Sequence, residues 1–236
     1  MGLCSRNGKG LPILPFLGVT ALVVWGAYLF STVGDSLTPL AIALTYISPY
    51  IKGIIIGLIL GDGSLQLLKG RKNASFRLGQ CSANSGFLWH VFSLLQHYCQ
   101  SYPAPYFGIR KGRTNFGLFI RTRSYPIFTE LYHLFHKNGR KTIPWCIAEL
   151  LTPQGLAMWA MSDGCKAKGG FYLSTNSFHY EEVQLLCNAL KERFNLDCTI
   201  HLQSGQPRLY ICCSSMNRFR SIVAPYFHSS MMYKLY

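Results

Sequence analysis

Two short apolar runs, each ending in an Asp-Gly pair, constrain this chain more than any other feature of its sequence. The first run covers residues 54–63 and the second covers residues 155–164. Each run is about one helix long, is hydrophobic on all sides and is followed by glycine, which commonly ends a helix. A helix that is apolar all round must be buried on all sides. We therefore expect two buried helices, each capped by a glycine in the left-handed conformation.

Small residues within both runs favour direct packing of one helix on the other. Gly57 and Gly61 lie one helical turn apart, and Ala157 and Ala160 share a face of the second run. Small side chains stacked in this way let two helix backbones approach closely. The expected arrangement is a pair of helices in contact along a seam.

The two runs carry Asp62 and Asp163, which are two of only four aspartates in the chain. A carboxylate at the end of a helix lies at the negative end of the helix dipole, where a compensating cation is favourable. If the helices pack side by side, both carboxylates meet at one end of the seam. A divalent metal ion is the usual means of neutralising two such charges. One Asp-Gly run alone would indicate an ordinary turn, but two runs in matching surroundings predict a metal site.

The charge balance of the chain indicates a polyanionic partner. Among 236 residues, 23 Lys and Arg oppose 9 Asp and Glu, for a formal net charge of +14. Nucleic acid is the first partner that this excess favours, and an anionic membrane is the second. The nine cysteines show no C-x-x-C spacing. Their pattern argues against a zinc site or a disulfide scaffold and favours a reducing compartment.

The N-terminal stretch differs in composition from the rest of the chain. Residues 11–30 contain no charged side chain and follow Arg6 and Lys9. This length is sufficient to cross a bilayer, although Pro12 and Pro15 weaken the first turns of a helix. A membrane span, a targeting segment and translated sequence from an upstream exon all remain possible interpretations. We expect an N-terminal extension over residues 1–48, a first repeat over 49–150 and a second repeat over 151–236.

The chain after residue 48 is expected to be an internal repeat. In the first half, period-two alternation and turn signals predict strands at 64–70 and 74–80, a helix at 86–100, a hairpin of 106–111 with 115–121, and a helix at 125–137. In the second half they predict a strand at 170–174, a helix at 180–194, a hairpin of 198–203 with 208–213, and a helix at 216–227. The expected fold class is α+β, with two pseudo-symmetric αββαββα repeats and a pair of four-stranded antiparallel sheets.

Each predicted sheet leaves one face without covering helices. Basic turns and open-face positions supply the residues expected to bind nucleic acid: Lys69, Arg71, Lys72, Arg77, Arg110, Arg113, Arg121, Arg123, Lys166, Lys168, Thr199, His201, Gln203, Arg208 and Tyr210. Such side chains reach phosphates and base edges. For any one position, simple solvation of an antiparallel sheet is the better explanation. That explanation does not account for the nearly uniform positive sign, which favours a basic saddle that fits duplex DNA.

At this point the sequence resembles the LAGLIDADG homing endonucleases, specifically the single-chain, two-repeat kind encoded in organellar group I introns. The runs IIGLILGDG and LAMWAMSDG stand where that family has its two signature helices. KTIP at residues 141–144, STNSF-x-x-EEV at residues 174–183 and the terminal MMYKL are similar to the omega-intron branch of the family. The resemblance covers residues 53–236.

The resemblance implies specific roles for residues of this chain. Asp62 and Asp163 would bind the metal, Mg²⁺ or Mn²⁺, together with the backbone carbonyls of Gly61 and Ser162. Lys141 and Lys234 stand at the positions of the basic residues of the family's active centre. The implied activity is a double-strand break at a long, asymmetric DNA site, made by a monomer with an internal two-fold, in a mitochondrion or plastid.

Two other functions remain open from the sequence. The first is an RNA maturase that assists splicing of a group I intron without cleaving DNA, with intron RNA as a partner. The second is a membrane-anchored, basic nucleic-acid-binding protein, suggested by residues 11–30 and the net charge. The membrane hypothesis leaves the paired Asp-Gly runs unexplained.

Overall fold

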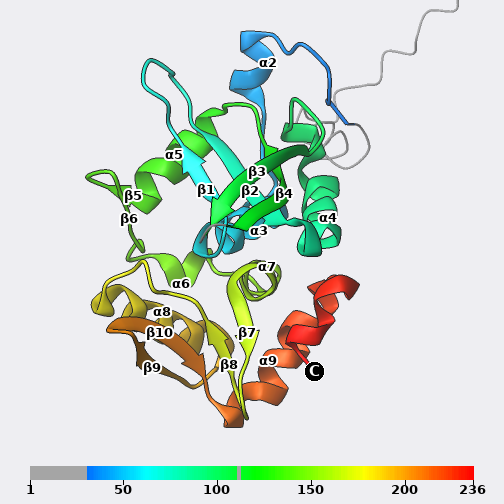
Figure 1. Cartoon of the computed structure of the whole chain (residues 1–236). Helices are drawn as coiled ribbons and strands as arrows, with labels where there is room; N and C mark the ends of the chain where they lie inside the picture. The colour runs from blue at the N-terminus through cyan, green and yellow to red at the C-terminus, as the bar shows by residue number, and fades with distance from the viewer. Residues whose placement is uncertain (1–30, 111–112) are drawn as a thin grey trace, which may run out of the picture.

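The computed structural model describes residues 31–110 and 113–236, and it contains two four-stranded antiparallel sheets (Figure 1). The first sheet is formed by β1 (Ser64–Gln66), β2 (Ser75–Cys81), β3 (Ala104–Arg110) and β4 (Arg113–Arg121), in the order β1-β2-β4-β3. The second is formed by β7 (Gly164–Lys166), β8 (Phe171–Leu173), β9 (Cys198–Gln203) and β10 (Gln206–Ile211), in the equivalent order β7-β8-β10-β9. The predicted α+β fold with two repeats is therefore confirmed.

Two buried helices, α3 (Pro49–Leu60) and α7 (Pro153–Asp163), pack against each other between the two sheets (Figure 1). Both begin in the same way. The hydroxyls of Ser48 and Thr152 accept hydrogen bonds from Ile51 N and Gly155 N, and a proline follows each cap. A hydroxyl cap followed by proline is favourable because the first N–H groups of a helix have no partner within it. The two runs are therefore the helices that the sequence predicted.

Glycines let the backbones of α3 and α7 approach very closely. A Cβ atom at Gly57 would collide with the carbonyl of Gly155, and one at Gly61 would collide with the Ser162 hydroxyl. The predicted left-handed caps are wrong, because neither Gly63 nor Gly164, the glycines that follow the two aspartates, has a positive φ. The glycines are needed because there is no room for a side chain.

In the first half, the covered face of the sheet packs against α4 (Ser85–Leu95) and α5 (Pro126–Phe135). Phe76, Leu78 and Ile120 lie on this face and are fully or almost fully buried. The helix expected over residues 125–137 ends earlier, and its last residues form a small hairpin of β5 (His136–Lys137) and β6 (Arg140–Lys141). Asn138 and Gly139 both have positive φ in its turn, which is the backbone that an Asn-Gly hairpin requires.

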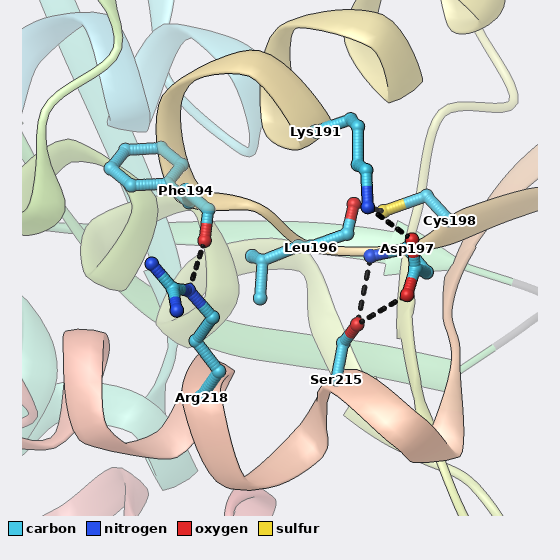
Figure 2. A network of polar contacts seen from close by, with 7 residues as sticks. All are labelled: Lys191, Phe194, Leu196, Asp197, Cys198, Ser215 and Arg218. Carbon is cyan, nitrogen blue, oxygen red and sulfur yellow. Dashed lines mark hydrogen bonds and ion pairs between the residues drawn. The ribbon is translucent and has the colours of Figure 1, made fainter.

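In the second half, α8 (Tyr180–Phe194) packs on β9 and β10, while α9 (Met216–Val223) packs beside α7 and places Phe219 against Phe171 of β8. A network of polar contacts joins the end of α8 to the start of α9 (Figure 2). Arg218 Nε donates to the Phe194 carbonyl at 2.6 Å, and Lys191 pairs with Asp197 at 2.7 Å. The remaining short elements are η1 (Ser82–Asn84), η2 (Gln96–Tyr98), α6 (Ile147–Leu150), η3 (Cys213–Ser215), η4 (Ala224–Tyr226) and η5 (Ser229–Lys234).

Part of the N-terminal extension contacts the first half of the fold. Residues 32–35 bind the guanidinium of Arg123, and α2 (Pro39–Leu44) follows them. The apolar stretch at residues 11–30 lies outside the described residues. Across residues 31–110 and 113–236, none of the helices has the length and apolar character needed to cross a membrane. The boundary at residue 48 remains a prediction.

Candidate functional site

The four residues predicted to be catalytic lie together at one end of the α3–α7 seam. Asp62 follows α3 and Asp163 ends α7, while β6 and η5 supply Lys141 and Lys234. Lys141 Nζ lies 3.4 Å from the Gly61 carbonyl. Lys234 Nζ donates to the Met161 carbonyl at 2.6 Å and lies 3.4 Å from the Ser162 carbonyl. Each lysine therefore contacts the backbone directly before one of the two aspartates.

Mutual electrostatic effects show that these four side chains form one cluster. Burial, together with the nearby charge of Asp62, raises the pKa of Asp163 to about 6, against the opposing effect of both lysines. Burial also raises the pKa of Asp62. Burial lowers the pKa of Lys141 to about 8 and lowers that of Lys234, although both aspartates oppose the change. Such shifts in a group of acids and bases are typical of catalytic sites.

Gln80 is a residue of the site that the sequence reasoning missed. Its Nε2 donates to Asp62 Oδ2 at 2.6 Å, and its Oε1 accepts from Asn84 Nδ2 at 3.0 Å. This hydrogen bond favours the ionised form of Asp62 and holds its orientation. The available signal was the alternation of β2, where Gln80 falls on the same face as Phe76 and Leu78 but is polar.

The donor atoms at the end of the seam fit a hard divalent cation. All are oxygens: two carboxylates, with the carbonyls of Gly61 and Ser162 directly before them. The two lysine ammonium groups lie next to these carbonyl oxygens, which shows that the oxygens are oriented toward a position where a cation is favourable. Across the described parts of the chain, no group of three or more His, Cys, Asp or Glu could hold a metal. A metal here would therefore complete its shell with water and phosphate oxygens, as Mg²⁺ commonly does.

The open face of the second sheet carries a network of polar and aromatic side chains. The Arg208 guanidinium lies over the Tyr172 ring at 4.4 Å and donates to Gln203 Oε1 and Cys165 Sγ, at 2.9 and 2.8 Å. His201 stacks on Tyr210 at 4.8 Å. Thr199 lies on the same face, opposite Tyr210. The sequence prediction named five of these residues but missed Tyr172 and Cys165, which come from the two short strands.

The open face of the first sheet is more strongly basic. Arg77 and Arg121 are directly opposite each other on neighbouring strands, where like charges repel. The Arg77 guanidinium lies over the Phe119 ring at 4.5 Å, and Arg121 Nε donates to Ser75 Oγ at 3.3 Å. Within the described residues neither arginine forms an ion pair with a carboxylate. Two adjacent cations without an acidic partner make this face suitable for phosphate.

Arg123 corrects the predicted set of nucleic-acid-binding residues. It lies beyond the end of β4 and is only 9% exposed. Its Nη1 donates to Thr32 Oγ1 and the Cys99 carbonyl, and its Nη2 donates to the carbonyls of Thr32 and Asp35, all within 2.6–2.8 Å. The sequence prediction continued the strand alternation past Arg121, where β4 has already ended, and therefore placed Arg123 on the open face of the sheet. Its guanidinium group therefore binds backbone carbonyls and a hydroxyl inside the protein and does not face the solvent.

The other predicted binding residues lie at the ends of strands or in turns. Five are exposed in turns or at strand ends: Lys69, Arg71, Lys72, Lys166 and Lys168. The backbones of Arg110 and Arg113 pair at the end of the β3–β4 hairpin, whereas their side chains lie outside the described part of the structure. The structure therefore brings together the four catalytic candidates, while it distributes the binding candidates over two sheet faces.

The fold and the site together define a single-chain protein with two related halves and one shared cluster of acids and bases between two basic or polar sheet faces. The model of the LAGLIDADG DNA endonuclease family matches residues 52–219. The chain therefore belongs to this family.

Three similar proteins illustrate the range of the family. The homing endonuclease I-WcaI, solved bound to its DNA recognition sequence, superimposes with a TM-score of 0.78 and 27% identity, over 86% of this chain and 96% of that one. DNA endonuclease I-ChuI of Chlamydomonas applanata is 27% identical over 78% of this chain and 93% of its own length. Cytochrome b mRNA maturase bI2 of Saccharomyces cerevisiae is 34% identical over 78% of this chain. The match spans about half of the yeast protein, 47%.

Proposed function

We propose that this protein is a homing endonuclease that makes a site-specific double-strand break in DNA by metal-dependent hydrolysis. The observation that carries the proposal is the cluster of Asp62, Asp163, Lys141 and Lys234 at the end of the helix seam. Family membership and the similarity to I-WcaI, which was solved bound to its DNA recognition sequence, support it. The two halves differ in sequence, so the target is expected to be long and asymmetric.

Each residue of the cluster has a role in this proposal. Asp62 and Asp163, with the carbonyls of Gly61 and Ser162, would hold Mg²⁺ or Mn²⁺. Such ions orient and acidify water and stabilise the leaving oxygen. The ammonium groups of Lys141 and Lys234 stabilise negative charge that develops on the phosphate. Gln80 keeps Asp62 oriented and ionised through its 2.6 Å hydrogen bond.

The two sheet faces would bind the DNA on either side of the scissile phosphates. Arg77 and Arg121 contribute positive charge that attracts the DNA backbone. The Tyr172 ring holds the guanidinium of Arg208 in a defined orientation. A guanidinium held in this way suits guanine or phosphate. DNA is the proposed partner, and the protein is proposed to act as a monomer because both halves of the site are in one chain.

The direct test incubates the full chain with DNA that joins the two exons flanking its own reading frame. The reaction contains Mg²⁺, and a parallel reaction contains a chelator. We expect two defined ends at one position, lost in the chelator. DNA that remains intact at every Mg²⁺ and Mn²⁺ concentration would contradict the proposed activity.

Replacing Asp62 or Asp163 by Asn should abolish double-strand cutting while leaving DNA affinity within about twofold. Asparagine keeps the shape of the side chain but removes the charge that holds the metal, whereas binding depends on the basic sheet faces. Cleavage is measured on plasmid DNA and affinity by fluorescence anisotropy. Full cleavage by Asp62→Asn in Mg²⁺ would argue against a role for Asp62 in metal binding.

A second candidate function is that of an RNA maturase, favoured by the 34% identity to a yeast protein named cytochrome b mRNA maturase. In this case the chain would assist splicing of its own intron, and the same basic surface would bind RNA. Splicing of that intron in vitro, with and without the protein, tests the idea. If Asp62→Asn still promotes splicing, the two activities use different residues.

An organellar location, in a mitochondrion or a plastid, is proposed on the same basis. Cytochrome b, named in the yeast relative, indicates an intron in an organellar gene. Mapping the reading frame to its genome tests this location.

A further inference from the structure

One carboxylate of the second half binds the loop that carries a catalytic lysine of the first half. Glu182 lies in the first turn of α8 and accepts four hydrogen bonds. Two come from the guanidinium of Arg140 at 2.8 and 3.0 Å, one from Ile143 N at 3.2 Å, and one from His179 N at 2.8 Å. Four bonds are about the number that a carboxylate can accept.

These contacts bracket Lys141, the lysine of the proposed catalytic cluster. Arg140 directly precedes it, and Ile143 follows two residues later. Lys141 itself lies 5.5 Å from the ring centroid of Phe178, a buried residue just before α8. Its Nζ then lies beside the Gly61 carbonyl of the first half. The second half therefore holds the Lys141 loop at three points.

Helix capping alone does not explain this arrangement. A capping box requires that Glu182 bind the N–H of His179, and that bond lies within the second half. The bonds to Arg140 and Ile143 cross between the halves. The ion pair also differs from the surface pair Lys191–Asp197 (Figure 2), whose side chains are 55% and 53% exposed. The Glu182 side chain is only 15% exposed.

The segment that carries Lys234 also contacts the opposite half. The C-terminal segment that carries it lies beside α4 of the first half (Figure 1). His228 stacks on His90 of α4 at 4.9 Å, and Ser230 lies against Gly86 of the same helix. Each lysine of the cluster therefore lies in a segment that contacts the half of the chain that does not contain it.

We propose that Glu182 is a positioning residue for Lys141, so that the cutting centre beside Asp62 is complete only when α8 is docked on the first half. This inference rests on the proposed endonuclease function. Because Lys141 contacts the backbone before Asp62 and Lys234 contacts the backbone before Asp163, loss of Glu182 affects one of the two strand cuts more than the other.

The test compares Glu182→Gln with Glu181→Gln. The control removes the same charge from the same helical turn, but Glu181 is exposed. On a supercoiled plasmid that carries the target, Glu182→Gln should slow one strand cut by about 10- to 100-fold, since small misplacements of catalytic groups have effects of this size. Nicked plasmid then accumulates, while DNA affinity stays within about twofold. Glu181→Gln should behave like the wild type.

Arg140→Gln approaches the same contact from the other side and should produce the same nicked intermediate. The double variant should be no slower than Glu182→Gln alone, because the ion pair that Arg140→Gln removes is already lost in Glu182→Gln. Equal slowing of both strands, or wild-type rates in Glu182→Gln, would overturn the inference. Equal slowing is what a general loss of folded protein would cause.

A measurement without cleavage separates this inference from the proposed function. Amide hydrogen exchange over residues 140–143 should be faster in Glu182→Gln and unchanged in Glu181→Gln. If the wild type cuts no DNA but exchange shows this pattern, the endonuclease proposal fails while the attachment of the loop stands. Unchanged exchange in Glu182→Gln would show that Glu182 does not hold the loop.

Discussion

At the scale of single residues, the position of an arginine relative to the end of a strand decides whether its side chain is exposed or buried. Arg121 and Arg123 are two residues apart, and simple alternation would place both on the open face of the sheet. Arg121 is exposed on that face. Arg123 lies beyond the strand and binds Thr32, Asp35 and Cys99 inside the protein. Arginine is therefore exposed at one position and bound inside the protein at the other, and DNA binding is proposed only for Arg121.

This difference predicts opposite effects of two matched substitutions. Arg123→Met should reduce the free energy of unfolding by about 2–3 kcal/mol, because buried carbonyls lose a charged donor. Arg121→Met should leave stability unchanged but weaken DNA binding, and it should reduce the slope of log affinity against log salt by about one. Urea denaturation and anisotropy titrations at several salt concentrations measure both effects. A stable Arg123→Met protein with weakened binding would reverse the assignment.

At the scale of secondary structure elements, the central feature is how closely α3 and α7 approach. The carbonyl of Gly155 occupies the space that a side chain at position 57 would need. The backbones can therefore bring Asp62 and Asp163 to one end of the seam. Every residue of α3 from Gly53 to Leu60 is buried, so hydrophobicity does not distinguish the face that contacts α7. The close spacing of the two helices depends on the glycine at the contact.

Gly57→Ala should therefore destabilise the protein by about 1–3 kcal/mol, because the added methyl group forces the two backbones apart. Cleavage should fall as well, since the aspartates move with the helices. Gly108→Ala is the control: a Cβ there meets open space, and alanine in a strand costs nothing relative to glycine. Urea denaturation compares the variants. Equal midpoints for Gly57→Ala and the wild type would show that the seam can relax.

At the scale of the whole molecule, contacts between the two halves complete the cluster at their interface. The Arg140–Glu182 pair and the His90–His228 stack each connect one half to the other. The site is therefore a property of the docked halves.

The His90–His228 stack predicts that stability falls in acid. Burial lowers the pKa of His90 below its usual 6.5, and the nearby His228 lowers it further. His90 in the unfolded chain then binds a proton more readily than His90 in the folded chain. Its contribution to the free energy of unfolding is therefore fully present above about pH 6.5 and is lost as the pH falls below that value. The wild type should lose more stability than His90→Gln between pH 7.5 and pH 5.5 in urea denaturation. Identical losses would contradict the prediction.

The sequence by itself determined the two buried helices, the repeated order of strands and helices, and the four residues of the proposed catalytic cluster. These follow from local patterns: an apolar run with an Asp-Gly end, alternation of period two, and motifs at matching positions in both halves. The Asn138-Gly139 hairpin was also readable from the sequence, because that dipeptide favours a tight turn, although it was interpreted as the end of a helix.

Only the tertiary structure decided which residues support that cluster. The roles of Gln80, Phe178 and Glu182 arise from contacts with residues 18 to 42 positions away. Neither the alternation of β2 nor the STNSF-x-x-EEV motif indicated these contacts. The burial of the Arg123 side chain likewise depends on its contact with Thr32, 91 residues earlier in the chain. Local periodicity indicates which face of an element is buried, but it carries no information about which distant group that face meets. That partner is chosen when the two halves pack around α3 and α7.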